Sequence, residues 1–229
     1  MKPTLVTTLC FLLFSFTIYF PLPFTHANKF IVKDIFGNPV VPSGSYYIWP
    51  DYLINGGELR LGETENSTCP FTVLQDYSNL GPGLPVKFTP QNQTSSDDPI
   101  TLMLPIDITF ENKPDCAESS KWLVVEEENE YPAPWVTIDG TNKNVYDGWF
   151  QIVGFKKTGY LIFFCHKLLS PTRGVCIYLS RRNDENGMRL VYEMDGDALG
   201  AVFVNVDDAA RARRSSVLKK DHAFTLPMI

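Results

Sequence analysis

The chain has 229 residues, a formal net charge of −6 and 13% aromatic residues. This acidic balance argues against nucleic acid or an anionic membrane surface as the main partner, because both repel a negatively charged protein. The core between the N-terminal segment described next and a C-terminal tail has about 180 residues, which is one domain's worth and can bury roughly 70% of the unfolded surface.

The first 27 residues have the pattern of a secretory signal peptide. Lys2 is followed by an apolar run over residues 5–20 and by a small-residue cleavage site that ends at Ala27. The alternative, a membrane anchor, needs a longer span, whereas this run is interrupted by Ser15. We expect removal of residues 1–27, secretion to the apoplast or the vacuole, and no membrane attachment afterwards. The mature chain then has 19 basic residues, because Lys2 is lost, against 26 acidic ones.

Four cysteines remain after Cys10 leaves with this segment, namely Cys69, Cys116, Cys165 and Cys176. In a secreted chain an even set predicts disulfides, and four cysteines allow three connectivities, of which sequential pairing is the simplest. A zinc site is the alternative, but the chain has no C-x-x-C pair and only one histidine near a cysteine. We therefore expect no metal.

Two Asn-x-Thr sequons begin at Asn66 and Asn92. In a secreted chain both are predicted to lie on the surface as glycosylation sites.

Short β-branched and aromatic runs, separated by Gly, Pro and Asn, follow one another along the chain. In chain order they cover residues 30–40 (as strand, turn, strand), 46–49, 59–61, 71–75, 86–88, 100–104, 106–110, 122–125, 135–138, 150–153, 160–164, 177–179, 190–192 and 201–206. No window before the C-terminal tail has a helical period, so the pattern predicts an all-β barrel or sandwich of about a dozen strands. Residues 208–229, polar and Ala/Arg-rich before a short apolar end, are predicted to be an exposed, partly helical or disordered extension.

Several spaced motifs resemble the plant Kunitz (soybean trypsin inhibitor) family. The pattern V-x-D-x-x-G-x-x-V-x(5)-Y-x-I over residues 32–48 resembles its N-terminal signature. Further similar motifs are C-P-F-T-V-L-Q at 69–75, W-L-V-V at 122–125, D-G-W-F at 147–150, Y-L-I-F-F-C at 160–165 and R-L-V at 189–191. The resemblance covers about residues 30–206.

The resemblance implies a β-trefoil over residues 28–207, with twelve strands in three pseudo-repeats. It also implies the disulfides Cys69–Cys116 and Cys165–Cys176. We expect a monomer without a cofactor.

The family's usual activity implies binding to a secreted or vacuolar serine protease, either an endopeptidase or a carboxypeptidase. In the family the loop between the fourth and fifth strands enters the protease cleft like a substrate. Here alignment places Gln93 or Asn92 at the specificity position, and neither is basic, so we expect weak inhibition of trypsin. The Asn with which the family braces this loop aligns with Pro42, which has no side-chain amide, and a glycan on Asn92 would block the loop.

The loop between Cys165 and Cys176 is the leading candidate contact, because the usual loop lacks a basic residue and its bracing Asn. It presents Thr172 and Arg173 between a proline and a glycine, which suits a partner with an acidic pocket. The alternative for the whole chain is a non-inhibitory defence or storage glycoprotein of the same fold. A third hypothesis is a carbohydrate-binding trefoil. It is disfavoured, because the sequence lacks the repeated Q-x-W motif that is common in trefoil lectins.

An enzyme is not expected. After loss of the N-terminal segment only His166 and His222 remain, and the sequence has no G-x-S-x-G nucleophile motif.

Overall fold

The computed structural model describes residues 30–51, 56–64, 68–78, 83–92, 95–127, 131–138, 140, 143–156, 159–167 and 174–213. The fold described below is that of the unit that begins at Ile31. The predicted signal peptide, the sequon asparagine Asn66 and the candidate contacts Gln93, Thr172 and Arg173 lie outside the described residues.

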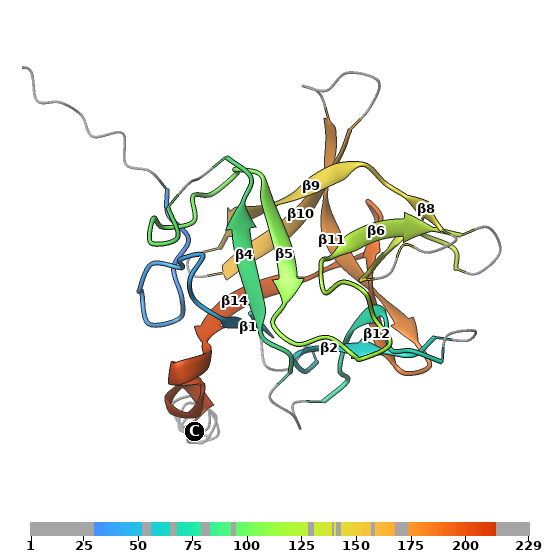
Figure 1. Cartoon of the computed structure of the whole chain (residues 1–229), viewed down its shortest axis with the longest axis horizontal. Helices are drawn as coiled ribbons and strands as arrows, with labels where there is room; N and C mark the ends of the chain where they lie inside the picture. Colours follow the sequence, from blue (N-terminus) through green and yellow to red (C-terminus); the bar gives the residue numbers. More distant parts are fainter. Residues whose placement is uncertain are drawn as a thin grey trace, which may run out of the picture. The chain divides into compact units, whose positions relative to one another are not determined.

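The described part of the chain contains 14 strands (Figure 1). They are β1 (Tyr46–Pro50), β2 (Leu59–Gly62), β3 (Thr72–Gln75), β4 (Val86–Pro90), β5 (Ile106–Phe110), β6 (Leu123–Glu126), β7 (Trp135–Thr137), β8 (Asn144–Val145), β9 (Gly148–Phe155), β10 (Gly159–Lys167), β11 (Gly174–Asp184), β12 (Gly187–Tyr192), β13 (Asp197–Ala198) and β14 (Gly200–Asn205). Since β8 and β13 have only two residues each, twelve strands are of three residues or more.

Six of these strands close into a barrel. Their order is β14-β1-β4-β5-β9-β10, and β10 pairs in turn with β14, so no edge is left open. Strand β5 shows why the sequence builds a barrel wall: Ile106, Ile108 and Phe110 are buried, while Asp107 and Thr109 between them are only half-buried. Side chains of a strand alternate between its two faces, so this pattern directs one face into the barrel.

The three hairpins β2–β3, β6–β7 and β11–β12 form the rest of the fold. One strand of each pairs with the other two, through the contacts β3–β12, β3–β7 and β7–β12. A closed six-stranded barrel with a cap of three mutually paired hairpins is a β-trefoil. The predicted fold class is therefore confirmed.

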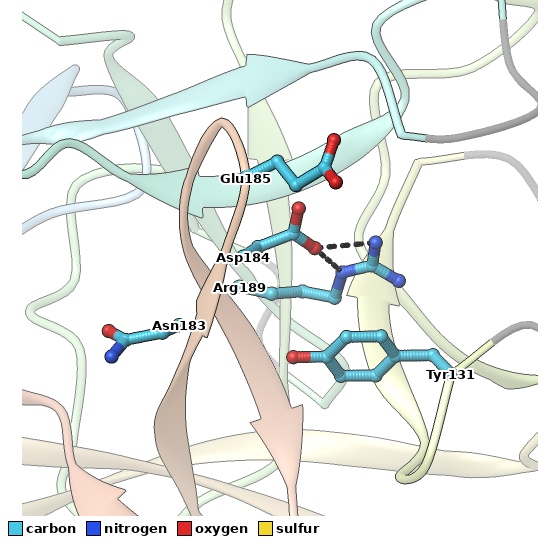
Figure 2. A pocket seen from close by; sticks show the side chains of 5 residues that line it. All are labelled: Tyr131, Asn183, Asp184, Glu185 and Arg189. Carbon is cyan, nitrogen blue, oxygen red and sulfur yellow. Dashed lines mark hydrogen bonds and ion pairs between the residues drawn. The ribbon is translucent and has the colours of Figure 1, made fainter.

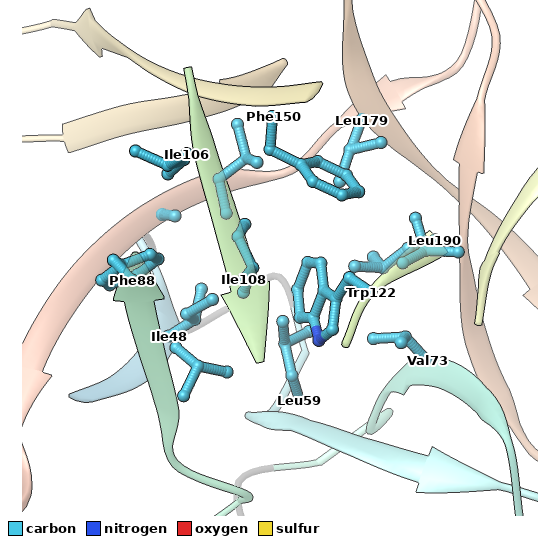
Figure 3. Packing of buried hydrophobic residues seen from close by; sticks show 14 of the residues in the cluster. Ile48, Leu59, Val73, Phe88, Ile106, Ile108, Trp122, Phe150, Leu179 and Leu190 are labelled. Carbon is cyan, nitrogen blue, oxygen red and sulfur yellow. The ribbon is translucent and has the colours of Figure 1, made fainter. Parts of the chain in front are cut away.

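The core fills the space between the barrel and the cap (Figure 3). Trp122 is fully buried at its centre, and its indole meets the ring of Phe150 edge-on with centroids 6.0 Å apart. Around these rings pack aliphatic residues from both barrel and cap, among them Ile48, Leu59, Val73, Ile108 and Leu190. The core thus joins strands that are far apart in sequence into one unit.

Two of the predicted strand segments are wrong. Residues 100–104 form one isolated bridge, between Thr101 and Ile31, and then a turn in which Met103 has a φ of 62°. In the segment 30–40 only isolated bridges form, such as Lys33 with Pro39. An apolar run cannot continue as a strand once its backbone enters the left-handed region.

Both predicted disulfides, Cys69–Cys116 and Cys165–Cys176, are confirmed. The second joins two residues that face each other across the β10–β11 ladder.

We expect the double substitution Cys165→Ala/Cys176→Ala to lower the free energy of unfolding by about 3 kcal/mol, because opening this short closed loop enlarges the unfolded ensemble. Urea unfolding followed by tryptophan fluorescence measures this change. The wild-type protein under reducing conditions is the control for the loss of both bridges. A change below about 1 kcal/mol would contradict the expectation.

The C-terminal extension differs from its prediction at its beginning. A 3₁₀ turn (Val206–Asp208) continues into a helical segment over residues 209–213, as the expected partial helix requires. However, Ala212 is only 2% exposed and packs with Trp49 and Val204. Arg213 pairs with Glu58 at 3.2 Å, so one face of this segment is docked on the fold, while residues 207, 210, 211 and 213 are exposed as predicted. Residues 214–229 lie outside the described residues.

Candidate functional site

The connection between β4 and β5, residues 91–105, is the candidate site. Figure 1 shows it in green at one end of the two strands, beside the blue N-terminal segment. Its described residues at 91–92 and 95–98 are exposed, and their side chains are polar or acidic. Ile100, by contrast, is fully buried. The connection therefore has an exposed polar first part and a buried anchor after it.

The two ends of the connection are tied together. The backbone N–H of Gln91 donates to the carbonyl of Pro105 at 3.1 Å. The side-chain amide of Gln91 donates to Oδ1 of Asp107 at 3.0 Å, and Oδ2 of Asp107 pairs with Nζ of Lys121 at 2.9 Å. Hydrogen bonds to backbone and side chain together fix the residue at which the exposed part begins.

The N-terminal segment braces the middle of the connection. The N–H of Ser43 donates to the carbonyl of Ser96 at 3.1 Å, and the N–H of Ile100 donates to the carbonyl of Val40 at 2.8 Å. Pro42 has no side-chain amide, but the backbone amide of the next residue, Ser43, supplies a brace instead. Sequence reasoning missed this contact, because every residue except proline has such an amide and no side-chain pattern marks it.

The last part of the connection is fixed to β9. The N–H of Met103 donates to the carbonyl of Ile152 at 2.9 Å. The described part of the connection is thus held at its start, middle and end, which is the condition for presenting a loop in one conformation.

The connection carries negative charge and no positive charge. Residues 91–105 contain Asp97 and Asp98 and no Lys or Arg. Of the two residues that the sequence places at the specificity position, Asn92 is exposed and Gln93 lies outside the described residues. Glycosylation of the Asn92 sequon requires an exposed side chain, and Asn92 meets this condition.

A cavity of about 300 Å³ adjoins the base of this connection. The residues that line it include Asp107, Lys121, Tyr146, Phe150 and Phe164. The hydroxyl of Tyr146 donates to Oε2 of Glu126 at 2.9 Å, and its ring stacks on His166 with centroids 4.6 Å apart. The polar side chains that line the cavity thus already have partners, Lys121 with Asp107 and Tyr146 with Glu126, as is usual in a structural cavity.

Burial and the hydrogen bond to Glu126 raise the pKa of Tyr146 from 10.0 to about 12. Because the folded pKa is the higher one, the stabilisation from this tyrosine is fully present below pH 10 and is lost as the pH rises from 10 to about 12. We expect the free energy of unfolding to fall over that interval, and Tyr146→Phe to make the fall shallower. Urea unfolding of both proteins at several alkaline pH values measures the difference. Identical slopes for the two proteins would contradict the assignment.

A second hollow, of about 280 Å³, lies beside the β11–β12 turn (Figure 2). Arg189 is only 3% exposed there, and it forms an ion pair with Asp184 at 2.6 Å. The guanidinium of Arg189 lies over the ring of Tyr131, 3.9 Å from its centroid. An arginine held by a carboxylate and an aromatic face is a structural element of the cap.

Within the described residues, no three His, Cys, Asp or Glu side chains are grouped to hold a metal. Nor is any helix in this part of the chain long and apolar enough to cross a membrane.

The β10–β11 hairpin carries the other predicted contact loop. Its strands are fixed by the Cys165–Cys176 disulfide, while Thr172 and Arg173 fall in the interval 168–173 outside the described residues. The structure therefore leaves the role of Arg173 a prediction.

The described β-trefoil presents an exposed loop on a fixed scaffold, an arrangement suited to contact with another molecule. The family model described as "Trypsin and protease inhibitor" matches residues 32–205. The chain belongs to this Kunitz-type family of serine protease inhibitors, as its sequence motifs predicted, and it is not an enzyme.

The relatives cover nearly the whole domain. A "Kunitz-type trypsin inhibitor-like 2 protein" of Pisum sativum is 41% identical over 214 residues, covering 90% of this chain and 95% of the relative. The "Subtilisin inhibitor CLSI-II" of Canavalia lineata is 36% identical over 167 residues, covering 70% and 85%. Soybean trypsin inhibitor, solved in complex with porcine pancreatic trypsin, is 27% identical with a TM-score of 0.65, covering 77% of this chain and 99% of that one.

Proposed function

We propose that this chain is secreted and inhibits a serine protease outside the cell or in the vacuole, by presenting the exposed part of the β4–β5 connection to the active-site cleft like a substrate. The observation that carries the proposal is the anchoring of that connection. Gln91 is tied to Pro105, Ser96 to Ser43, and Met103 to Ile152.

Anchoring matters for inhibition because binding a mobile loop costs conformational entropy. A loop that already has its bound conformation loses little freedom when the protease closes around it. After cleavage, the same contacts would hold the two new ends close together and favour rejoining of the peptide bond. A slow, reversible substrate is an inhibitor.

The target we propose is a protease without an acidic specificity pocket. With Asp97 and Asp98 and no basic residue in the connection, an acidic pocket gains no ion pair and meets added negative charge. One relative is named a subtilisin inhibitor, which also supports a target other than trypsin. Inhibition of trypsin is expected to be weak.

Arg173 is the alternative contact for an enzyme with an acidic pocket. The hairpin that carries it is closed by a disulfide, which supports rigid presentation. A single substitution in either loop shows which of them contacts the protease, because the two loops connect different strand pairs.

The test is titration of the mature chain against trypsin, chymotrypsin, subtilisin, pancreatic elastase and a serine carboxypeptidase, with Gln93→Ala and Arg173→Ala beside the wild type. We expect inhibition of subtilisin or elastase that Gln93→Ala weakens and Arg173→Ala leaves unchanged. The reverse pattern would assign the contact to Arg173. If no enzyme is inhibited, the chain is a non-inhibitory member of the family.

A further inference from the structure

Met103 and Leu104 form an exposed apolar pair at the end of the β4–β5 connection. Their exposed fractions are 66% and 49%. Other exposed residues of the connection, at 91–92 and 95–98, are polar or acidic. Leu102, just before the pair, is partly buried and packs against the core. The two exposed apolar side chains therefore follow directly on a residue that packs against the core.

The backbone at Met103 is held in an unfavourable conformation. Its φ of 62° lies in the left-handed region, which glycine or asparagine adopts far more readily than a long side chain. The hydrogen bond from its N–H to the carbonyl of Ile152 keeps it there. A glycine would satisfy the same turn with less strain.

The fold gains little from this methionine. A buried methionine would offset the strain of its backbone by removing apolar surface from water, but this side chain remains largely in solvent. Leu104, half in solvent, likewise leaves apolar area uncovered. A residue that costs conformational energy without contributing to the core suggests a role in binding.

We propose that Met103 and Leu104 form a secondary contact surface for the protease that the connection inhibits, packing against an apolar surface beside its cleft. This inference rests on the proposed function and deepens it. The Gln91–Pro105 hydrogen bond places Leu104 next to the start of the exposed part, so a protease that binds residues 91–98 lies close to the pair. Methionine suits such a contact, because its flexible thioether adapts to an uneven surface.

This surface explains how an inhibitor without a basic specificity residue can still bind. Each aliphatic side chain that becomes buried contributes about tenfold in affinity. This gain in affinity does not depend on the specificity pocket, so it is the same whichever residue of the inhibitor enters that pocket.

The experiment measures the inhibition constant and the melting temperature of four variants: Met103→Ala, Met103→Gly, Leu104→Ala and, as a control, Met194→Ala. Met194 is exposed to the same degree, 65%, but follows β12 in the hairpin cap. The enzyme is the one that the wild type inhibits most strongly among those named above.

We expect Met103→Ala and Leu104→Ala each to weaken inhibition about tenfold, while Met194→Ala leaves it unchanged. Met103→Gly should weaken inhibition to the same extent as Met103→Ala while keeping or raising the melting temperature by a few degrees, because glycine relieves the left-handed backbone. Lower affinity together with equal or higher stability is not the result of a damaged fold.

Three outcomes overturn the inference. If the wild type inhibits no enzyme, the proposed function fails and this contact surface fails with it. If the wild type inhibits but the Met103 and Leu104 variants stay within twofold of it, the contact surface alone is wrong. If these variants change only the concentration dependence of sedimentation, the pair serves association with a second copy of the chain instead.

Discussion

We expect Gln93→Arg to convert the chain into a trypsin inhibitor that binds at least about 100-fold more tightly than the wild type. The arginine would place a guanidinium against the carboxylate at the bottom of trypsin's pocket, where the ion pair is desolvated and bidentate. Coupling energies of such pairs at interfaces reach several kcal/mol, which corresponds to two or more factors of ten. Glutamine offers only neutral hydrogen bonds there.

Asn92→Arg is the control for the register of the loop. Counting from Cys69 places residue 93 at the specificity position, whereas alignment on Pro90 places residue 92 there. Only the residue that enters the pocket should produce the gain, so the two arginine variants should differ by at least tenfold. Production without glycosylation, or with Thr94→Ala, removes any glycan from Asn92. If neither arginine variant gains affinity, the β4–β5 connection is not presented as proposed.

Asp184→Ala should be among the most destabilising single substitutions, lowering the free energy of unfolding by about 3–5 kcal/mol. Asp184 is 10% exposed, and it neutralises Arg189, which is 3% exposed. Within the described residues Nη1 of Arg189 has no hydrogen-bond partner, so loss of Asp184 would leave a buried cation with only the aromatic faces of Tyr131 and Trp135. The measurement is urea unfolding at neutral pH.

The double substitution Asp184→Ala/Arg189→Met shows whether the cost comes from the unpaired charge. Methionine keeps much of the apolar length of Arg189 and carries no charge, so the double variant should be more stable than Asp184→Ala alone. Asp147→Ala is the control, because the Asp147–Lys167 pair lies on the surface with 73% of the Asp147 side chain exposed. That pair should contribute less than about 1 kcal/mol. A small effect of Asp184→Ala would show that Arg189 reaches water in solution.

The residue pattern was sufficient for the all-β class because it reflects packing, whereas the β-trefoil itself was implied by the family resemblance. Alternation of buried and half-buried residues along β5, turn residues between strands and paired cysteines each have a local physical cause that can be read without coordinates. The segment 100–104 is the instructive exception. Its apolar residues have strand-like composition, yet the backbone turns at Met103, where the bond to Ile152 outweighs local preference.

The residue pattern predicted an all-β barrel or sandwich, and the resemblance to the Kunitz family implied the β-trefoil and the two disulfides. The absence of a basic residue from the β4–β5 connection is also evident from the sequence. How that connection is held depends on contacts that form only in the folded chain. The brace from Ser43 to Ser96 uses backbone groups, and the pair of Met103 and Leu104 is exposed through a turn that depends on β9. Backbone hydrogen bonds between distant segments leave no mark on residue type, so they appear only when the chain is folded.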